Sequence, residues 1–443
     1  MSPLARSRTA SLPPAPTPPN DETTRALLKA AVATAAAKGY RAMTARDLIG
    51  ATGISSQTFY ARFPNKETCF VAAVAFLADN ATAQARAVAG DAAATPAARL
   101  RLLADGLPRL AAQHPIGTRV LLLESAAGGA AAVAHRDRAA DAVVALVGGR
   151  PDVARAVLGA AARAALDAIL TGTEATLPRT ASALATWANG YADLLDAPLP
   201  AGATGPSRRR GRAPGSLVPV GPEGTRRLRP GPRSEPRAFV EHSQSDRILD
   251  AVATVVAERG LDALTIRTLT PVAEVSSKAF YQHFSSLDEA FAATMLAGGR
   301  GALAAALPAT MAEADWADGV ASGLRALLEF LSEETTFAKV ALVDAPAAGA
   351  AGAAFQREAI ATIAATIAHG YERAGLATID VVSEAVAAGA WELCADRVRR
   401  GAAATLPELA PTLAALALAP VLGAAAALKS ARRIAAATAP SGA

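Results

Sequence analysis

The sequence is poor in the residues that build disulfides, metal sites and aromatic cores. Only 4% of its 443 residues are aromatic, and it contains two cysteines, Cys69 and Cys394. Two cysteines without local partners form neither a disulfide framework nor a four-ligand zinc site on their own. We therefore expect a cytoplasmic protein whose core is built from closely packed helices rather than from aromatic side chains.

Signals of catalysis are also missing. The five histidines show neither His-x-x-x-His nor Glu-x-x-His spacing, and no serine stands in a Gly-x-Ser-x-Gly sequence. Metalloenzymes and serine hydrolases usually carry such patterns because their side chains must converge on one reacting atom. We expect no catalytic residue, no metal and no other cofactor, although an enzyme stays the rival hypothesis from another class.

Long apolar runs of the kind that cross membranes are scarce. The first twenty residues are rich in proline and lack a continuous apolar segment followed by a cleavage site, which argues against a secretory signal. Residues 413–428 form the best membrane candidate, but they are short and contain Pro420 and Gly423. We interpret this segment as a core helix and expect no membrane partner.

Alanine, by contrast, is abundant. It supplies most of the 52% apolar fraction, and it is the best helix former. Runs with the period-two alternation of strands are scarce, whereas long Ala, Leu and Val stretches carry charges at three- and four-residue spacing. The sequence predicts an all-α protein, and its length is enough for about two to four domains.

The chain also contains an internal duplication. A shift of 221 residues superposes 27–70 on 248–291 without a gap, and 44–63 shares eight of twenty residues with 265–284. The best-matched nonapeptides are SSQTFYARF at 55–63 and SSKAFYQHF at 276–284. Because the identities fall on residues with structural meaning rather than on alanine, we infer that one unit was copied within the chain.

Each copy begins with the pattern of a helix-turn-helix. In the first copy a helix ends at Gly39, Thr44 caps a second helix, and Gly53 and Ser55 stand where a turn and a third helix begin. In the second copy a first helix is expected to begin at Ser243 or Ser245 and to end at Gly260. Its apolar stripe consists of Ile248, Leu249, Val252, Val255 and Val256.

The third helix of each copy has the composition of a DNA-reading helix. Phe59 and Phe63 lie four residues apart and face inward, which leaves polar side chains on the outer faces. Ser and Gln address base edges, Tyr and Arg suit phosphate oxygens, and a following helix N-terminus adds an anion site. The predicted DNA-binding residues are Thr44, Arg46, Ser55, Ser56, Gln57, Thr58, Tyr60, Arg62 and Lys66, with Thr265, Arg267, Ser276, Ser277, Lys278, Tyr281 and His283 in the second copy.

These motifs resemble a known family. The stretch SSQTFYARFPNKE, preceded by TARDLIGATGI, is similar to the DNA-binding head of the TetR family of bacterial repressors, and TIRTLTPVAEVSSKAFYQHFSSLDE is similar as well. The resemblance covers roughly 55 residues in each half. It implies an all-α protein with a DNA-reading head, a helical body that binds a small-molecule effector and dimerises, and double-stranded DNA as its partner.

The predicted organisation is therefore two fused units. Its parts are a tail at 1–20, a first head at 21–78, a first body at 79–197, a linker at 198–242, a second head at 243–298 and a second body at 299–440. The linker is rich in Pro, Gly and Arg and carries nine Arg against three Glu. We interpret it as a soluble tether, with an auxiliary DNA-binding arm as the alternative.

The two heads differ in charge and in turn chemistry. Residues 21–77 carry seven basic side chains against four acidic ones, a balance of +3, whereas residues 242–298 carry four against seven, a balance of −3. Glu274 replaces Gly53, Pro271 falls inside the second helix, and Leu287 replaces Lys66. We expect the first head to dominate DNA affinity. The alternatives are two equally competent heads, or an interaction scaffold or sensor whose second head no longer binds DNA.

The bodies supply the candidates for effector binding and dimerisation. Small-ligand pockets are usually lined by apolar and aromatic side chains, and the second body is the richer in aromatics. Segments near 154–197 and 380–440 could pair within one chain, which predicts a monomeric pseudo-dimer, with a homodimer carrying four heads as the alternative. The effector candidates are Trp187, Tyr191, Phe337, Phe355, Tyr371 and Trp391.

Overall fold

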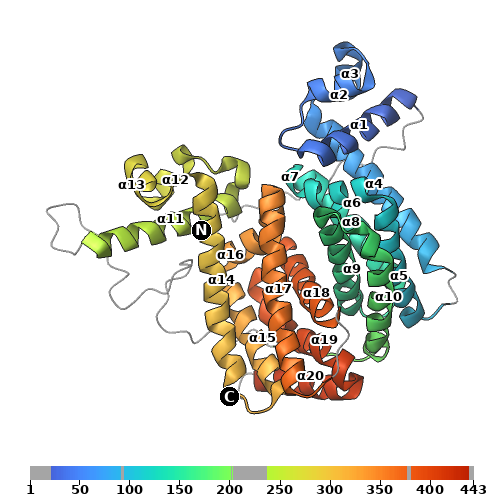
Figure 1. The fold of residues 1–443 in the computed structure, drawn as a ribbon, viewed down its shortest axis with the longest axis vertical. Helices are drawn as coiled ribbons and strands as arrows, with labels where there is room; N and C mark the ends of the chain where they lie inside the picture. Colours follow the sequence, from blue (N-terminus) through green and yellow to red (C-terminus); the bar gives the residue numbers. More distant parts are fainter. Residues whose placement is uncertain (1–20, 91–93, 201, 203–236, 377–380, 439–443) are drawn as a thin grey trace, which may run out of the picture. The chain divides into compact units, whose positions relative to one another are not determined.

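The protein is described here by a computed structural model, which covers residues 21–90, 94–200, 202, 237–376 and 381–438. Within these ranges the chain is helical, with short 3-10 and π-helical segments and no strand (Figure 1). The all-α prediction is confirmed. The chain divides into two compact units, one of Met1–Ala87 with His114–Val143, and the other of Val88–Gln113 with Val144–Ala443.

The first unit holds the first head and part of the first body. Its first three helices begin where a side-chain oxygen accepts a backbone N–H, at Asp21, Thr44 and Ser55, as the sequence predicted for the two hydroxyl caps. The helices that lie wholly or mostly in this unit are α1 (Glu22–Lys38), α2 (Ala45–Thr52), α3 (Ser56–Arg62), α4 (Lys66–Ala89), α6 (Pro115–Arg119), the π-helix η1 (Val120–Glu124), α7 (Ser125–Ala127) and α8 (Gly129–Val147).

The second unit combines the rest of the first body with the second head and the second body. The first body contributes α5 (Pro96–Gln113), α9 (Pro151–Thr171), η2 (Glu174–Thr176), α10 (Leu177–Ala188) and η3 (Asn189–Leu194). The second head consists of α11 (Arg237–Arg259), η4 (Leu261–Ala263), α12 (Ile266–Ala273), α13 (Ser277–His283) and the start of α14 (Leu287–Met311). The second body continues with α15 (Trp316–Glu333), α16 (Thr335–Lys339), the π-helix η5 (Val340–Asp344), η6 (Ala345–Ala348), α17 (Ala350–Arg373), α18 (Val382–Arg399), η7 (Ala403–Leu409), α19 (Ala410–Leu422) and α20 (Ala424–Thr438).

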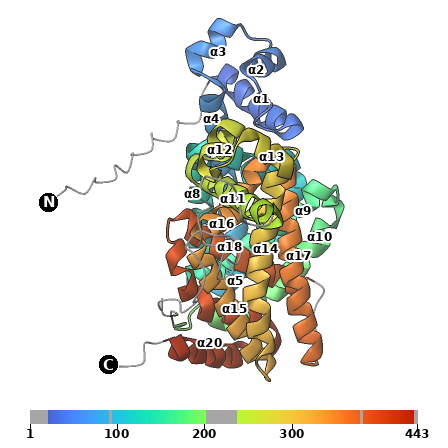
Figure 2. The ribbon, with the colours of Figure 1, turned by 90° about the vertical axis from the view of Figure 1, so that its left-hand side faces the viewer.

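The start of the second head differs from the prediction. Helix α11 begins at Arg237, inside the range expected for the linker, so the expectation of a cap at Ser243 or Ser245 is wrong. The residues AFVEH at 238–242 contain neither glycine nor proline, so the helix can extend upstream of both serines. Residues 203–236 of the expected linker lie outside the described residues. Figure 2 shows α14 leaving the second head and running along α15 in the second body.

Helices of the two bodies pack against each other within the second unit. Helix α9 of the first body lies along α18 of the second, as Figure 1 shows. A Cβ atom added at Gly389 would lie 2.8 Å from the carbonyl oxygen of Ala156, so the backbones approach too closely for any larger residue. Arg155 forms an ion pair with Asp396 across the same contact, at 3.3 Å. Both helices fall in the segments that the sequence proposed for pairing.

The apolar segment at 413–428 is divided between two helices. Helix α19 ends at Leu422, Gly423 takes a φ of 81°, and α20 follows. By length and composition two helical stretches of the described residues could cross a membrane, Leu287–Met311 and Ala403–Leu422. The second is 72% buried inside the protein, as expected of a core helix, and the pair does not indicate a membrane protein.

Two tyrosine hydroxyls anchor α19 to the bodies around it. Pro420 has no N–H, so the carbonyl of Leu416 lacks its usual helical donor. The hydroxyl of Tyr191, from the first body, donates to that carbonyl at 2.8 Å. The hydroxyl of Tyr371, from the second body, donates to the next carbonyl, that of Ala417, at 2.6 Å. The hydroxyl of Tyr191, from the first body, thus replaces the helical hydrogen bond to Leu416 that Pro420 removes from the second body.

Tyr191→Phe is expected to lower the free energy of unfolding by about 1–3 kcal/mol, because the buried Leu416 carbonyl then loses its donor. Tyr371→Phe is the matched control. It is expected to cost about 1 kcal/mol, since the N–H of Val421 still lies one helical turn beyond Ala417. Urea denaturation followed by circular dichroism compares the two variants. A larger loss for Tyr371→Phe would contradict this account of the proline.

Candidate nucleic-acid interface

Helices α2 and α3 of the first head form a helix-turn-helix. Gly53 takes a left-handed conformation, with φ 68° and ψ 12°, which reverses the chain after α2. The side chain of Ser55 then accepts the backbone N–H of Thr58 at 3.0 Å and opens α3. Glycine reaches this conformation without steric strain. The turn that the sequence predicted from Gly53 and Ser55 is therefore present.

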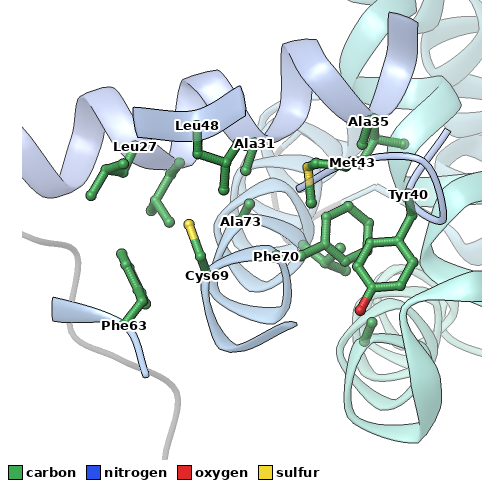
Figure 3. Close-up of a cluster of buried hydrophobic side chains, with 14 of the residues drawn as sticks. Leu27, Ala31, Ala35, Tyr40, Met43, Leu48, Phe63, Cys69, Phe70 and Ala73 are labelled. Carbon is green, nitrogen blue, oxygen red and sulfur yellow. The ribbon is translucent and has the colours of Figure 1, made fainter. Parts of the chain in front are cut away.

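The reading helix α3 is held by the core of the first head. Phe59 is fully buried and Phe63 is 9% exposed, so the inward face of α3 is apolar. Burial raises the pKa of the Cys69 thiol to about 12, which makes Cys69 a packing residue rather than a reactive one. Figure 3 shows this core, which includes Leu27 and Ala31 from α1, Leu48 from α2, and Cys69, Phe70 and Ala73 from α4.

The opposite face of α3 is polar and open to solvent. Ser56, Gln57 and Tyr60 are exposed, and Tyr60 keeps 55% of its surface accessible although it lies next to a buried phenylalanine. The Phe59 and Tyr60 rings meet edge-on at 5.2 Å. A short helix with a buried aromatic anchor and an exposed hydroxyl and amide face has the form of a groove-reading helix.

Arg62 is held by an acidic residue from another helix. Its Nε donates to Oδ2 of Asp21, the N-cap of α1, at 2.8 Å. The hydrogen bond from Arg62 is the largest cause that lowers the pKa of Asp21, to about 2. The pair is therefore ionised at neutral pH. The sequence offered Arg62 as a phosphate contact but did not reveal that Asp21 would compete for it.

The remaining predicted side chains of the first head divide into structural and exposed ones. Thr44 forms a capping box with Asp47, and Thr58 bonds to the hydroxyl of its cap Ser55, so these groups stabilise helix starts. Arg46 is exposed. The ammonium of Lys66 donates to three main-chain carbonyls between the first and second helices, of which the shortest, to Met43, is 2.8 Å. The side chain of Lys66 is thus turned toward the head.

The second head repeats the fold of the first. Ser276 caps α13 through the N–H of Ala279 at 3.1 Å, and Phe280 is fully buried. Tyr281 is 59% exposed, and Ser277, Lys278 and Arg267 are exposed as well, whereas Thr265 closes a capping box. His283, at the position of Arg62, is half-buried and lies 3.4 Å from Oε1 of Gln244. The reading face of the second head is therefore present, with Lys278 as its fixed positive charge and His283 in place of Arg62.

The turn of the second head is strained. Glu274 takes a φ of 52°, and it is the one non-glycine residue with a positive φ among the described residues. Such a conformation costs about 1 kcal/mol for a residue with a Cβ atom. Arg247 of α11 donates to the carbonyl of Glu274 at 3.4 Å and lies 3.9 Å from its carboxylate. Pro271 is also inside α12, as the sequence suggested, and is exposed there.

The helix after the reading helix also differs between the heads. In the second head Ser286 caps α14, and the carboxylate of Glu289 accepts the N–H of Ser285 at 2.7 Å. The hydrogen bonds from Ser285 lower the pKa of Glu289. A negative side chain thus occupies the positive end of this helix, where the helix dipole would otherwise favour a phosphate.

The effector candidates are distributed over both bodies. Trp187 and Tyr191 meet edge-on at 5.1 Å in the first body, and Tyr371 contacts the ring of Trp316 at 5.1 Å in the second. Burial is the largest cause that raises the pKa of both tyrosines, and their hydroxyls bond to α19 as described above. Phe337 is buried, while Phe355 and Trp391 are half-buried. Among the described residues no group of His, Cys, Asp and Glu side chains could hold a metal ion.

Comparison with known proteins gives a family match in both heads. The model of the bacterial regulatory proteins of the tetR family matches residues 27–73 and 248–307. No curated protein matches the chain. Among solved structures, the fatty acid degradation regulator FadR from Bacillus halodurans aligns over 38% of this chain and 97% of its own, with 14% identity and a TM-score of 0.33. A TetR-like transcriptional regulator from Rhodococcus sp. RHA1 aligns over 41% and 96%, with 25% identity and a TM-score of 0.33.

Glu274→Gly is expected to raise the free energy of unfolding by about 0.5–1 kcal/mol, because glycine relieves the left-handed strain and the exposed contact with Arg247 contributes little. Gly53→Glu makes the reverse change in the first head, where an added Cβ meets nothing within 4 Å. It should therefore lose about 1 kcal/mol to strain alone. Urea denaturation of both variants checks the pair, and a destabilised Glu274→Gly would argue against strain.

Proposed function

We propose that this chain, which belongs to the tetR family of bacterial regulatory proteins, is a repressor. It carries two family-type heads in one polypeptide and is a DNA-binding transcriptional regulator. It binds an operator through its helix-turn-helix heads and is released or modulated by a small-molecule effector. The observation that carries the proposal is the exposed face of α3 over the buried Phe59.

The proposed contacts of the first head follow from this face. Ser56 and Gln57 are exposed at the start of α3, where side chains reach base edges in a major groove. Tyr60 presents its hydroxyl beside them for a phosphate oxygen. Arg62 makes a phosphate contact after it exchanges Asp21 for the DNA backbone, which replaces one charge-assisted hydrogen bond by another.

We assign the larger share of affinity to the first head. Its formal charge is +3, whereas that of the second head is −3, and nucleic-acid affinity depends on positive charge. In the second head Glu289 occupies the helix N-terminus and His283 replaces Arg62. The operator is accordingly expected to be non-palindromic, with a well-specified half-site for the first head and a dissimilar or weaker one for the second.

We further propose that the two halves act as a pseudo-dimer within one chain. The contact of α9 with α18 supports this, because it joins the two bodies through a close approach at Gly389 and an ion pair. Covalent linkage gives each half a high effective concentration for the other. Effector sensing is assigned to the second body, whose aromatic residues outnumber those of the first.

A second candidate function is an interaction scaffold or sensor in which only the first head binds DNA. The acidic balance of the second head and its strained turn at Glu274 favour this alternative. In the first proposal the face of α13 around Tyr281 contacts a half-site of the operator, whereas in this alternative it does not.

Arg62→Ala is expected to weaken binding to an operator selected from a random DNA pool by about tenfold and to reduce the salt slope by about 1. His283→Ala should change affinity less than about threefold. Mobility-shift titrations at several stated salt concentrations give both values, and footprinting shows which half-site is lost. Equal losses in the two variants would count against a dominant first head.

Asp21→Asn tests the competition for Arg62 directly. Asparagine caps a helix as well as aspartate does, so α1 is retained while the acceptor loses its charge. This control is expected to bind the operator at least as tightly as the parent protein. A loss comparable to that of Arg62→Ala would mean that the ion pair with Asp21 orients the guanidinium instead of competing for it.

The pseudo-dimer predicts a monomeric chain in solution. Light scattering at micromolar concentration is expected to give the mass of one chain, 44.6 kDa, and one chain should bind each operator. A mass twice as large would favour the dimer with four heads. In that case α9 would still contact α18, but this contact would not be a substitute for dimerisation with a second chain.

A further inference from the structure

In each copy a π-helix of the body meets the end of the first helix of its head. In the first copy the buried carboxylate of Glu124, the last residue of η1, accepts the N–H of Tyr40 at 3.0 Å, just beyond α1. In the second copy Lys339, directly before η5, donates to the carbonyl of Ala257 near the end of α11 at 2.6 Å and pairs with Asp344 at 2.9 Å. Because the last carbonyls of a helix lack helical partners, a cation there fixes the end of α11.

The second of these junctions continues into the other half of the protein. Gln356 of α17 is 5% exposed, and its amide donates to the carbonyls of Ala341 and Leu342, both within η5, at 3.2 and 3.3 Å. The side-chain oxygen of Gln356 accepts from Nη1 of Arg163 at 3.2 Å. Arg163 lies on α9, which belongs to the first body.

Arg163 also bonds to its own helix α9 and to α17. Its Nε donates to Asp167 on the same helix at 2.8 Å, and its Nη2 donates to the carbonyl of Ala353 on α17 at 3.3 Å. Its side chain is only 12% exposed. A buried guanidinium with three partners has little freedom to move without moving α17 as well.

The first copy has a different side chain at this place. The π-helices at 120–124 and 340–344 are 220 residues apart, which puts Arg136 at the position of Gln356. Arg136 forms an ion pair with Asp137 of its own helix at 3.0 Å. The duplicated sequence therefore shows that the fold does not require a glutamine here.

We propose that Arg163 and Gln356 are positioning residues of the second head, through which helix α9 of the first body sets the end of α11. Arg163 bonds to Gln356, Gln356 bonds to two carbonyls of η5, and Lys339, directly before η5, bonds to the carbonyl of Ala257. π-Helical segments often occur at functional sites, and η5 is the element that both sides of this path contact. The first body thus biases the second head. The effect of this coupling on DNA binding by the second head rests on the proposed function, whereas the coupling itself does not.

Hydrogen exchange of the full-length protein without DNA tests this coupling. Arg163→Met is expected to raise exchange rates at least fivefold in peptides that cover the end of α11 and η4, residues 256–264. Arg155→Met is the matched control, because it removes an ion pair that joins the same helix to α18. It should leave these peptides unchanged. Unchanged rates in Arg163→Met, or equal increases in both variants, would overturn the proposal.

A second variant separates positioning from plain packing. Gln356→Glu keeps an acceptor for Arg163 but lacks the N–H donors for η5, so it is expected to reproduce the faster exchange at 256–264. In a double-mutant cycle, Arg163→Met adds little to Gln356→Glu if both act on one path. Additive effects would contradict the path. Because exchange is measured without DNA, faster exchange with unaltered operator affinity would support the coupling and count only against DNA reading by the second head.

Discussion

The burial of one phenylalanine under each reading helix is the constraint on which the two heads depend. Phe59 and Phe280 are fully buried, and each lies next to a tyrosine that is more than half exposed. A helix of seven residues is too short to be stable alone, so this anchor determines which side faces solvent. Polar residues of α3 and α13 are presented because the helix cannot rotate without exposing the aromatic ring.

Because of the duplication, the first head can be compared directly with the second. Both heads keep the capped starts of their second and third helices and the aromatic anchor, while the turn and the start of the fourth helix have diverged. At the turn, Gly53 is replaced by a strained Glu274, and at the following helix a lysine is replaced by Leu287, close to Glu289. Phe59 persists as Phe280 because loss of a buried aromatic ring opens a cavity, whereas smaller core positions accept other apolar residues, as with Ala31 and Val252. Surface residues are free to change once the second half of a fused protein no longer needs to match the first.

An alanine-rich interior gives main-chain carbonyls an unusual role. Small side chains let helices approach closely, so the groups available for polar contact between them are often backbone oxygens. The side chains of Lys66, Tyr191, Lys339, Gln356 and Tyr371 all donate to such carbonyls. Several of these bonds join segments far apart in sequence, and they connect the first body with the second as well as body with head. These polar donors thus add direction to contacts between distant segments.

The sequence alone was sufficient for the helical class, the duplication, the turn at Gly53 and the inward positions of Phe59 and Phe63, because periodicity, caps and turn residues act within a few positions of the chain. The left-handed Glu274 followed from the same register. It was not sufficient for the start of α11, where helix-compatible residues continue upstream of the expected serine cap, or for the partners of Arg62 and Lys66. Those partners, like the pairing of Tyr191 with Leu416 and of Arg163 with Gln356, join residues separated by tens to hundreds of positions. Only the packed tertiary structure decided them, because a side chain chooses among distant acceptors by geometry that no local pattern encodes.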